Sequence, residues 1–299
     1  MLFDQITLID SCRLTEEGVQ EIATFSRQPL LRYHDVPTSD EETLARMGQS
    51  DCVLVSWQTP VSADVIAAAP SLKYIGMCCS LYSEAAANVD IAKARELGIR
   101  VLGVRDYGDE GVVEYIFAQL IHVFKGYGPC QWKPQPVELG GKSIGIIGLG
   151  TLGKMVARTA LHFGMEVYYF GRTRYPEVER EGVHYLHLHE LLSTCDVVTT
   201  HLPKHTILLG KQEFLVKKPN SILINTSLGP TFDVQACFTW LQNDPTSFGI
   251  FDSDGIGAHY QPFSELNNVL LYPRSAGFTE ESKVRLTQKV IANLKSFLE

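Results

Sequence analysis

The sequence lacks an excess of positive charge. Its 26 lysines and arginines are outnumbered by 34 aspartates and glutamates, which gives a formal net charge of −8 at pH 7. Nucleic acids and anionic membranes attract basic proteins and repel acidic ones. We therefore expect neither nucleic acid nor a membrane as a partner.

Long apolar runs are also missing. No stretch approaches the ~18 consecutive apolar residues of a membrane-spanning helix. The opening MLFDQITLID has neither the basic start nor the apolar segment of a secretory signal peptide. The 7 cysteines are odd in number and scattered, except for Cys78 and Cys79. This pattern favours free thiols over a disulfide framework, and we expect a cytoplasmic protein.

What is present is the composition of a globular chain, with 45% hydrophobic and 20% charged residues over 299 positions. Short apolar segments such as ITLID and DCVLVSW alternate with amphipathic ones, and Thr15 is a plausible cap for the first helix. Repeated β-α-β units of this length predict doubly wound parallel α/β sheets.

A segment rich in Gly and Pro, GYGPCQWKPQPVELGG, interrupts this pattern and reads as a linker. It follows a long apolar helix, EGVVEYIFAQLIHVF, and precedes a second α/β region. The last residues, from TEESK onward, form one amphipathic helix that can pack back on the first region. We expect one domain from residues 1–102 plus 278–299, and a second from residues 103–277.

Three glycines, Gly148, Gly150 and Gly153, form the pattern G-x-G-x-x-G between a predicted strand and a predicted helix. In a dinucleotide site the first makes a tight turn, the second lets the pyrophosphate approach, and the third lets helix and sheet pack closely. The N–H groups of Thr151 and Leu152 would then face the phosphates. The alternative is a glycine turn without a ligand.

The strand after this motif, EVYYF, is followed by Gly171, Arg172, Thr173 and Arg174. NAD sites place an acidic residue there to bind the ribose hydroxyls. A glycine removes that carboxylate, and arginines can bind a 2′-phosphate. This favours NADP over NAD as the cofactor. The alternative is that the two arginines only solvate a surface loop.

Six segments now occur in a familiar order: YGDEGVVEY, GIIGLGTLG, CDVVTTHLP, SILINTSLG, FGIFDSDG and VLLYPRSAG. Through them the sequence resembles the D-isomer-specific 2-hydroxyacid dehydrogenase family over nearly the whole chain. The resemblance implies a flavodoxin-like substrate domain, an inserted Rossmann domain that binds NAD(P), and a homodimer. It also implies further cofactor contacts from Leu202, Pro203, Thr206, Thr226, Asp252 and Gly277.

The three catalytic positions that the resemblance implies are all changed. The family's arginine, glutamate and histidine fall on Leu228, Gly257 and Arg274. Hydride delivery to a carbonyl creates an alkoxide that must be protonated and stabilised. A guanidinium with a pKa above ~12 keeps its proton at neutral pH, but it can bind an anionic group. Arg274 is therefore our candidate for orienting the substrate, and the alternative is an exposed rim residue.

Two further residues are candidate proton donors. The loop CCSLYSEAAANVD lacks the glycine-rich turn that the family has before Asn-Val-Asp, which makes Tyr82, and with it Ser83 and Glu84, candidates for substrate contact. His259 lies two residues beyond the lost glutamate. The alternative for the loop is an ordinary surface loop with Cys78 and Cys79 buried.

The histidines do not predict a metal site. In HYLHLH, alternation along a strand would place His187 and His189 on one face, but no carboxylate or cysteine cluster accompanies them. His201 matches a position that is commonly histidine for structural reasons.

We expect an NADP(H)-dependent oxidoreductase with an altered active site, which transfers hydride to or from a C=O, C=N or activated C=C group of a small anionic substrate. An imine suits such a site because it can arrive already protonated. One alternative is a catalytically inactive NAD(P)-binding regulatory or scaffolding protein. Another is an ordinary 2-hydroxyacid dehydrogenase that recruits its arginine from elsewhere.

Overall fold

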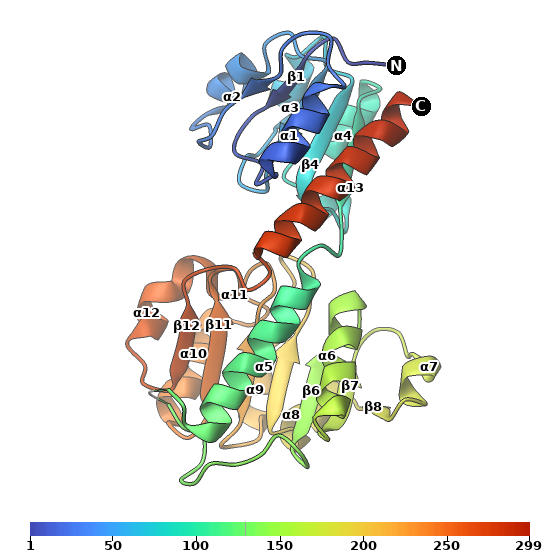
Figure 1. Ribbon diagram of the computed structural model, residues 1–299. Helices are drawn as coiled ribbons and strands as arrows, with labels where there is room; N and C mark the ends of the chain where they lie inside the picture. The colour runs from blue at the N-terminus through green and yellow to red at the C-terminus, as the bar shows by residue number, and fades with distance from the viewer. Residues whose placement is uncertain (129) are drawn as a thin grey trace. The chain divides into compact units, whose positions relative to one another are not determined.

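The computed structural model describes residues 1–128 and 130–299, so that Pro129 of the predicted linker lies outside the described residues. The chain divides into two compact units (Figure 1). Unit 1 comprises Met1–Tyr107 with Thr279–Glu299, and unit 2 comprises Gly108–Phe278. The predicted domain end at residue 102 falls inside a strand whose Val104 still pairs with Ser80 of unit 1.

Unit 1 is built on a five-stranded parallel sheet with the order β2-β1-β3-β4-β5. The order reverses between β1 and β3, as in flavodoxin-like sheets. The strands are β1 (Ile6–Leu8), β2 (Leu31–Arg32), β3 (Cys52–Val55), β4 (Tyr74–Ser80) and β5 (Arg100–Val104). The helices are α1 (Glu16–Ala23), α2 (Asp40–Met47), α3 (Ala63–Ala67), η1 (Glu84–Ala86), α4 (Ile91–Glu96) and α13 (Glu280–Leu298).

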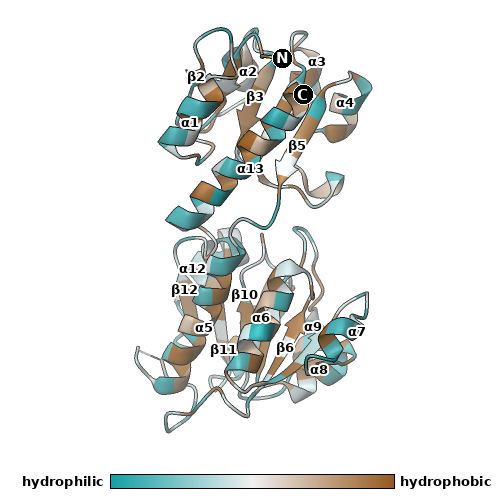
Figure 2. Ribbon diagram, turned by 45° about the vertical axis from the view of Figure 1, so that its right-hand side comes forward, coloured by the Kyte–Doolittle hydropathy of each residue, from teal (hydrophilic) through white to brown (hydrophobic). Residues whose placement is uncertain are grey.

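The last helix, α13, belongs to this sheet although it is more than 170 residues away from β5 in the chain. Leu286, Val290 and Leu294 share a buried cluster with residues of β1, β3 and β4. Figure 2 shows the apolar residues of this unit concentrated in the strands and on one side of its helices. Burial of that apolar surface attaches α13 to unit 1.

The start of α1 shows how packing overrides a local signal. Thr15 caps the helix, because its Oγ1 accepts a hydrogen bond from the Gly18 N–H over 3.1 Å. A capping box would have Glu or Gln at that third helical position. A β-carbon on Gly18 would overlap the Thr287 side chain of α13. Close packing of the two helices therefore requires the glycine.

Unit 2 is built on a seven-stranded parallel sheet with the order β12-β11-β10-β9-β6-β7-β8, which is the Rossmann order with one added strand. The strands are β6 (Ser143–Ile147), β7 (Glu166–Phe170), β8 (Val183–Tyr185), β9 (Val197–Thr200), β10 (Ile222–Asn225), β11 (Phe248–Asp252) and β12 (Val269–Tyr272). The helices are α5 (Asp109–Lys125), α6 (Thr151–His162), α7 (Pro176–Glu179), α8 (Leu188–Thr194), α9 (Lys211–Val216), α10 (Val234–Asn243), α11 (Ser253–Ile256), η2 (Gly257–His259) and α12 (Tyr260–Ser264).

The two parallel-sheet α/β domains that the sequence predicts are thus confirmed. Within the described ranges, no helix is both long enough and apolar enough to cross a membrane.

Two local expectations are wrong. The predicted loop at Cys78–Asp90 starts only after Ser80, because β4 extends to that residue, whereas Cys78 and Cys79 are buried as the alternative for this loop expected. His187 and His189 do not alternate along a strand, because β8 ends at Tyr185. His187 is the cap residue of α8, and His189 lies in that helix with Nε2 3.0 Å from Glu213 Oε1.

Candidate functional site

The turn between β6 and α6 has the shape of a dinucleotide cradle. Gly148 has φ +97, and a β-carbon there would overlap the His201 carbonyl oxygen. A β-carbon on Gly153 would overlap the carbonyl of Gly148. On Gly150 it would meet no atom within 4 Å. The first and third glycines are therefore needed for packing, and the second faces the open space that a pyrophosphate would fill.

The start of α6 leaves its own N–H groups available. Its cap residue, Gly150, provides no side-chain hydrogen bond, and the first turn contains no acidic residue. Thr151 is exposed and Leu152 is half-buried. Uncapped N–H groups and the helix dipole favour an anion at this position. The residues present therefore fit the phosphates of a dinucleotide.

The carboxyl ends of β9 and β10 are joined to each other beside this cradle. Asn225 Oδ1 accepts a hydrogen bond from Thr200 Oγ1 over 2.9 Å. Ser227 Oγ donates to the Thr200 carbonyl over 3.1 Å and accepts from the Leu202 N–H over 3.2 Å. These bonds hold the loop that carries Leu202 and, further along, Pro203 and Thr206.

Thr226 provides a second indication of a ligand. Its Oγ1 is buried and has no hydrogen-bond partner among the described residues. A buried hydroxyl left without a partner costs about 1–3 kcal/mol. Because the position is at the carboxyl end of β10, a cofactor hydroxyl is a suitable missing partner.

His201 directly follows β9, and its carbonyl lies against the glycine turn. Its Nε2 is 3.2 Å from Thr199 Oγ1, and its Nδ1 has no partner among the residues described. Burial lowers the pKa of His201 to about 4. The imidazole is therefore neutral at neutral pH and cannot supply a proton as an imidazolium.

The turn after β10 presents an apolar side chain. Asn225 Nδ2 donates to the carbonyls of Gly229 and Gly255 over 3.1 Å and 2.8 Å, and the Gly229 N–H donates to the Asp254 carbonyl over 3.0 Å. Gly229 has φ +109, which favours glycine. Leu228, at the tip, is 42% exposed. The tip of this turn therefore offers a hydrocarbon side chain and no charge.

Asp252 joins the ends of β11 and β12. Its Oδ1 accepts from the Gly255 N–H over 2.7 Å, and its Oδ2 accepts from the Ala276 N–H over 2.8 Å. The Ser253 N–H also donates to the Arg274 carbonyl over 3.2 Å. Burial raises the pKa of Asp252 to about 6. The backbone on both sides of Arg274 is therefore attached to the end of β11.

The Arg274 side chain is available for a ligand. It is exposed, and its guanidinium has no hydrogen bond or ion pair within the described ranges. Nearby in the same unit, the Tyr115 ring of α5 is 5.4 Å from that of Tyr272. The Tyr115 hydroxyl is buried without a partner among the residues described, and burial raises its pKa.

The sequence predicted that both arginines after β7 are available to bind a 2′-phosphate, but the structure distinguishes them. Arg172 and Thr173 are exposed, and no described residue pairs with Arg172. Arg174 instead forms an ion pair with Glu179, in which the Nη2–Oε2 distance is 2.7 Å.

The remaining predicted residues fall in different places. His259 is exposed in η2. Gly277 follows Arg274, and a β-carbon on it would lie 3.2 Å from the Gly108 carbonyl oxygen. Tyr82 belongs to unit 1, where the Arg105 guanidinium is 5.4 Å from its ring centroid. Unit 2 thus gathers the predicted cofactor residues and Arg274 at the carboxyl ends of its strands, whereas Tyr82 lies in the other unit.

Unit 1 contains a polar cluster that the sequence reasoning missed. The Asp10 carboxylate, after β1, accepts hydrogen bonds from the N–H and Oγ of Ser56, after β3, and from Cys12 N–H and Thr59 Oγ1. It braces the point where the strand order reverses, which is where α/β sheets bind ligands. Trp57, two residues beyond the end of β3, is 44% exposed. The sequence signal for this cluster was the position of Asp10 and Ser56 just after two buried strands.

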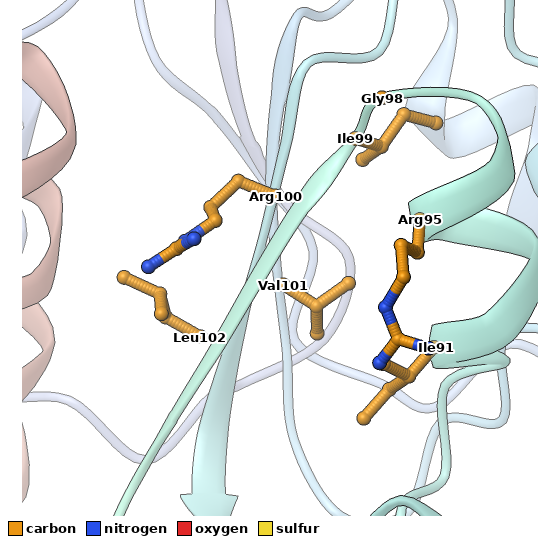
Figure 3. A pocket seen from close by; sticks show the side chains of 7 residues that line it. All are labelled: Ile91, Arg95, Gly98, Ile99, Arg100, Val101 and Leu102. Carbon is orange, nitrogen blue, oxygen red and sulfur yellow. The ribbon is translucent and has the colours of Figure 1, made fainter.

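A hollow of about 380 Å³ lies on unit 1 between α4 and β5 (Figure 3). It is lined by Arg95, Arg100 and apolar residues, and none of the predicted site residues contributes to it. Arg95 is already paired with Glu84. This hollow therefore offers no acid, base or cofactor cradle.

The chain is similar to several known proteins. The family described as D-isomer specific 2-hydroxyacid dehydrogenase, NAD binding domain, matches residues 125–276. A glyoxylate reductase of Korarchaeum cryptofilum is 28% identical over 95% of this chain and 90% of its own length. A hydroxypyruvate reductase of Blautia hydrogenotrophica is 27% identical over 88% of this chain and 86% of its own length.

Among solved structures, an acyclic imino acid reductase (Bsp5) in complex with NADPH and D-Arg has a TM-score of 0.83 and 25% identity. The match covers 98% of this chain and 97% of that one. The expected oxidoreductase class and a nicotinamide dinucleotide cofactor are thereby confirmed.

Proposed function

The chain belongs to the D-isomer specific 2-hydroxyacid dehydrogenase family, and from that premise we propose that it is an NADP(H)-dependent reductase of a small anionic imine. The observation that carries the proposal is the guanidinium of Arg274, which lies beside the end of β12 and has no partner among the described residues. The other two changed positions, Leu228 and Gly257, offer neither charge nor an acid or base.

A nicotinamide cofactor bound in the cradle supplies the hydride. Gly150 leaves room for its pyrophosphate, Gly148 and Gly153 allow the turn and the close packing beside it, and the N–H groups of Thr151 and Leu152 bind the phosphates. The Thr226 hydroxyl, which forms no hydrogen bond with any described residue, suits a cofactor hydroxyl. Further contacts fall to residues of the neighbouring strand ends, namely Leu202, Pro203, Thr206, Asp252 and Gly277. The exposed Arg172 and Thr173 receive the 2′-phosphate.

The substrate carboxylate pairs with Arg274, whose planar guanidinium can donate two parallel hydrogen bonds. Hydride then adds to the carbon of a protonated C=N group. The electron pair of the π bond goes to nitrogen, which keeps its proton, and the product is an amine. This step needs no acid from the protein, which suits a site in which Arg274 retains its own proton.

A keto acid is a poorer substrate for the same reason. The alkoxide formed from a C=O group must receive a proton. The candidate donors are water, Tyr82 and His259, because His201 is buried and neutral. The similarity to a structure described as an acyclic imino acid reductase with NADPH supports the choice of C=N.

The test measures loss of NADPH absorbance with keto acids such as glyoxylate and hydroxypyruvate, alone and mixed with ammonia or methylamine. We expect turnover to rise at least about tenfold when the amine allows an imine to form. Arg274→Ala should abolish that activity, and Arg274→Lys should restore part of it because the charge remains. Robust turnover of keto acids without amine would contradict the imine proposal.

The replaced residues also favour a second candidate function, a catalytically inactive NAD(P)-binding regulatory or scaffolding protein. None of Leu228, Gly257 and Arg274 can transfer a proton at neutral pH. Tight NADPH binding with no turnover on any keto acid, imine or enone would support this candidate.

We further propose a homodimer in the cytoplasm, since members of the family are commonly dimeric. Light scattering coupled to gel filtration would measure the mass against the 33.3 kDa of one chain.

A further inference from the structure

The loop after β7 is closed by a tyrosine at its base. The Tyr169 hydroxyl accepts a hydrogen bond from the Tyr175 N–H over 2.9 Å, and so connects the end of strand β7 to the start of α7. On the other side, the Phe170 carbonyl accepts from the Gly148 N–H over 2.9 Å. Residues 171–174 are therefore held at both ends next to the glycine turn, with Arg172 exposed between them.

Arg174 is part of the structure that holds this loop. Its Nε and Nη2 donate to the two carboxylate oxygens of Glu179 over 3.0 Å and 2.7 Å. Its guanidinium carbon is 4.9 Å from the centroid of the Tyr185 ring. Glu179 Oε1 also accepts from the Tyr169 hydroxyl over 2.7 Å. The Arg174 guanidinium is thus hydrogen-bonded to Glu179 and also lies over the Tyr185 ring.

The charges of this pair cancel at neutral pH. The Arg174 guanidinium, followed by the Tyr169 hydroxyl, lowers the pKa of Glu179, so the carboxylate is ionised. Two other cations close to α7 are paired with its acidic residues or their neighbour, because Lys154 Nζ is 3.3 Å from Glu177 and Arg158 Nε is 3.1 Å from Glu181. Of the two arginines in the loop, only Arg172 has no partner among the described residues.

We infer that, of the two arginines in this loop, only Arg172 recognises the 2′-phosphate of NADP(H), and that the Arg174–Glu179 pair is a neutral brace that sets the cofactor preference indirectly. Glu179 supplies a carboxylate beside the strand end where NAD sites place an acidic residue. Arg174 masks that carboxylate. Without the mask, Glu179 would repel a 2′-phosphate and could accept ribose hydroxyls. This inference rests on the proposed NADP preference.

The experiment compares the dissociation constants of NADPH and NADH by titration calorimetry. Arg172→Ala should weaken NADPH binding at least about tenfold and leave NADH binding within about twofold. Arg174→Ala should weaken NADPH binding but leave or strengthen NADH binding, because it unmasks Glu179. The double variant R174Q/E179Q removes both charges together and should restore the wild-type ratio of the two constants.

The double variant decides the inference. If R174Q/E179Q loses NADPH preference as far as Arg172→Ala does, Arg174 contacts the phosphate and the inference is overturned. An equal loss for both cofactors in Arg172→Ala would also overturn it. A wild-type protein that binds NADH more tightly than NADPH would instead contradict the proposed cofactor. Thermal unfolding of each variant verifies that the loop change has not unfolded the domain.

Discussion

The Asp252 carboxylate accepts a hydrogen bond from the Ala276 N–H over 2.8 Å, and this bond attaches the segment with Arg274 to the end of β11. The other carboxylate oxygen is occupied by the Gly255 N–H. An aspartate is needed because both backbone groups are donors. Asp252 is thus a positioning residue for Arg274 whatever contact it makes with the cofactor.

Asp252→Asn should destabilise the protein and misplace Arg274. An asparagine has one acceptor oxygen and one donor group, so one of the two N–H groups would face another donor. We expect a loss of about 1–3 kcal/mol in the free energy of unfolding, measured with urea, together with a raised KM for the substrate. Asp254→Asn, two residues away, is the control, and an equal loss there would argue against this role.

The pKa of Asp252 also predicts a pH dependence. Burial raises it to about 6, above the value of about 3.9 in an unfolded chain. The folded state therefore holds the proton more tightly, and stability falls as pH rises from about 3.9 through about 6. Relative to Asp252→Asn, the wild type should lose about 3 kcal/mol across that window. Parallel stability curves for the two proteins would contradict the assignment.

His201 predicts the opposite slope. Burial lowers its pKa to about 4, below the unfolded value of about 6.5. Its contribution to stability is present above about pH 6.5 and is lost as pH falls through about 4. The wild type should lose about 3 kcal/mol of unfolding free energy between these two pH values, and His201→Gln should not. The difference between wild-type and variant urea midpoints measures this effect. Because both proteins contain Asp252, its contribution cancels in this difference.

Lys217 should destabilise the folded protein at neutral pH. It is 6% exposed, and its Nζ donates to Ser221 Oγ over 2.8 Å and lies 5.0 Å from the Trp240 ring centroid. Burial lowers its pKa to about 7, below the unfolded value of about 10.4, so stability is lost as pH falls through about 7.

Lys217→Met should therefore raise the free energy of unfolding near neutral pH by about 1–3 kcal/mol, since a buried unpaired charge is costly. It should also flatten the stability profile between about pH 7 and 10. Lys218→Met, which breaks an ion pair with Asp196, is the comparison and should destabilise.

Gly171 predicts a change of cofactor. A β-carbon on it would meet only the Thr173 carbonyl oxygen at 3.7 Å, an ordinary contact, so the position does not require glycine for space. Gly171→Asp would restore a carboxylate that accepts ribose hydroxyls and repels a 2′-phosphate. We expect the dissociation constant of NADPH, divided by that of NADH, to rise by about tenfold or more, which is a change in favour of NADH. Gly171→Ala is the matched control and should leave the ratio unchanged.

The sequence by itself determined the parts that depend on neighbours in the chain. The alternation of apolar and amphipathic segments indicated parallel α/β sheets, and Gly148, Gly150 and Gly153 indicated the cradle, because turn and helix-start chemistry is local. The sequence also predicted that Leu228 and Arg274 stand where the family has an arginine and a histidine, since each lies beside a recognisable segment.

Only the tertiary structure decided how side chains from separate strands are used. It showed that Arg174 is paired with Glu179 while no described residue pairs with Arg172, that Asp252 holds the Arg274 segment through a backbone N–H, and that close packing against Thr287 requires Gly18. It also ended β8 before His187, against the alternating pattern. Each of these depends on burial and on contacts between segments that folding brings together, and no local pattern records them.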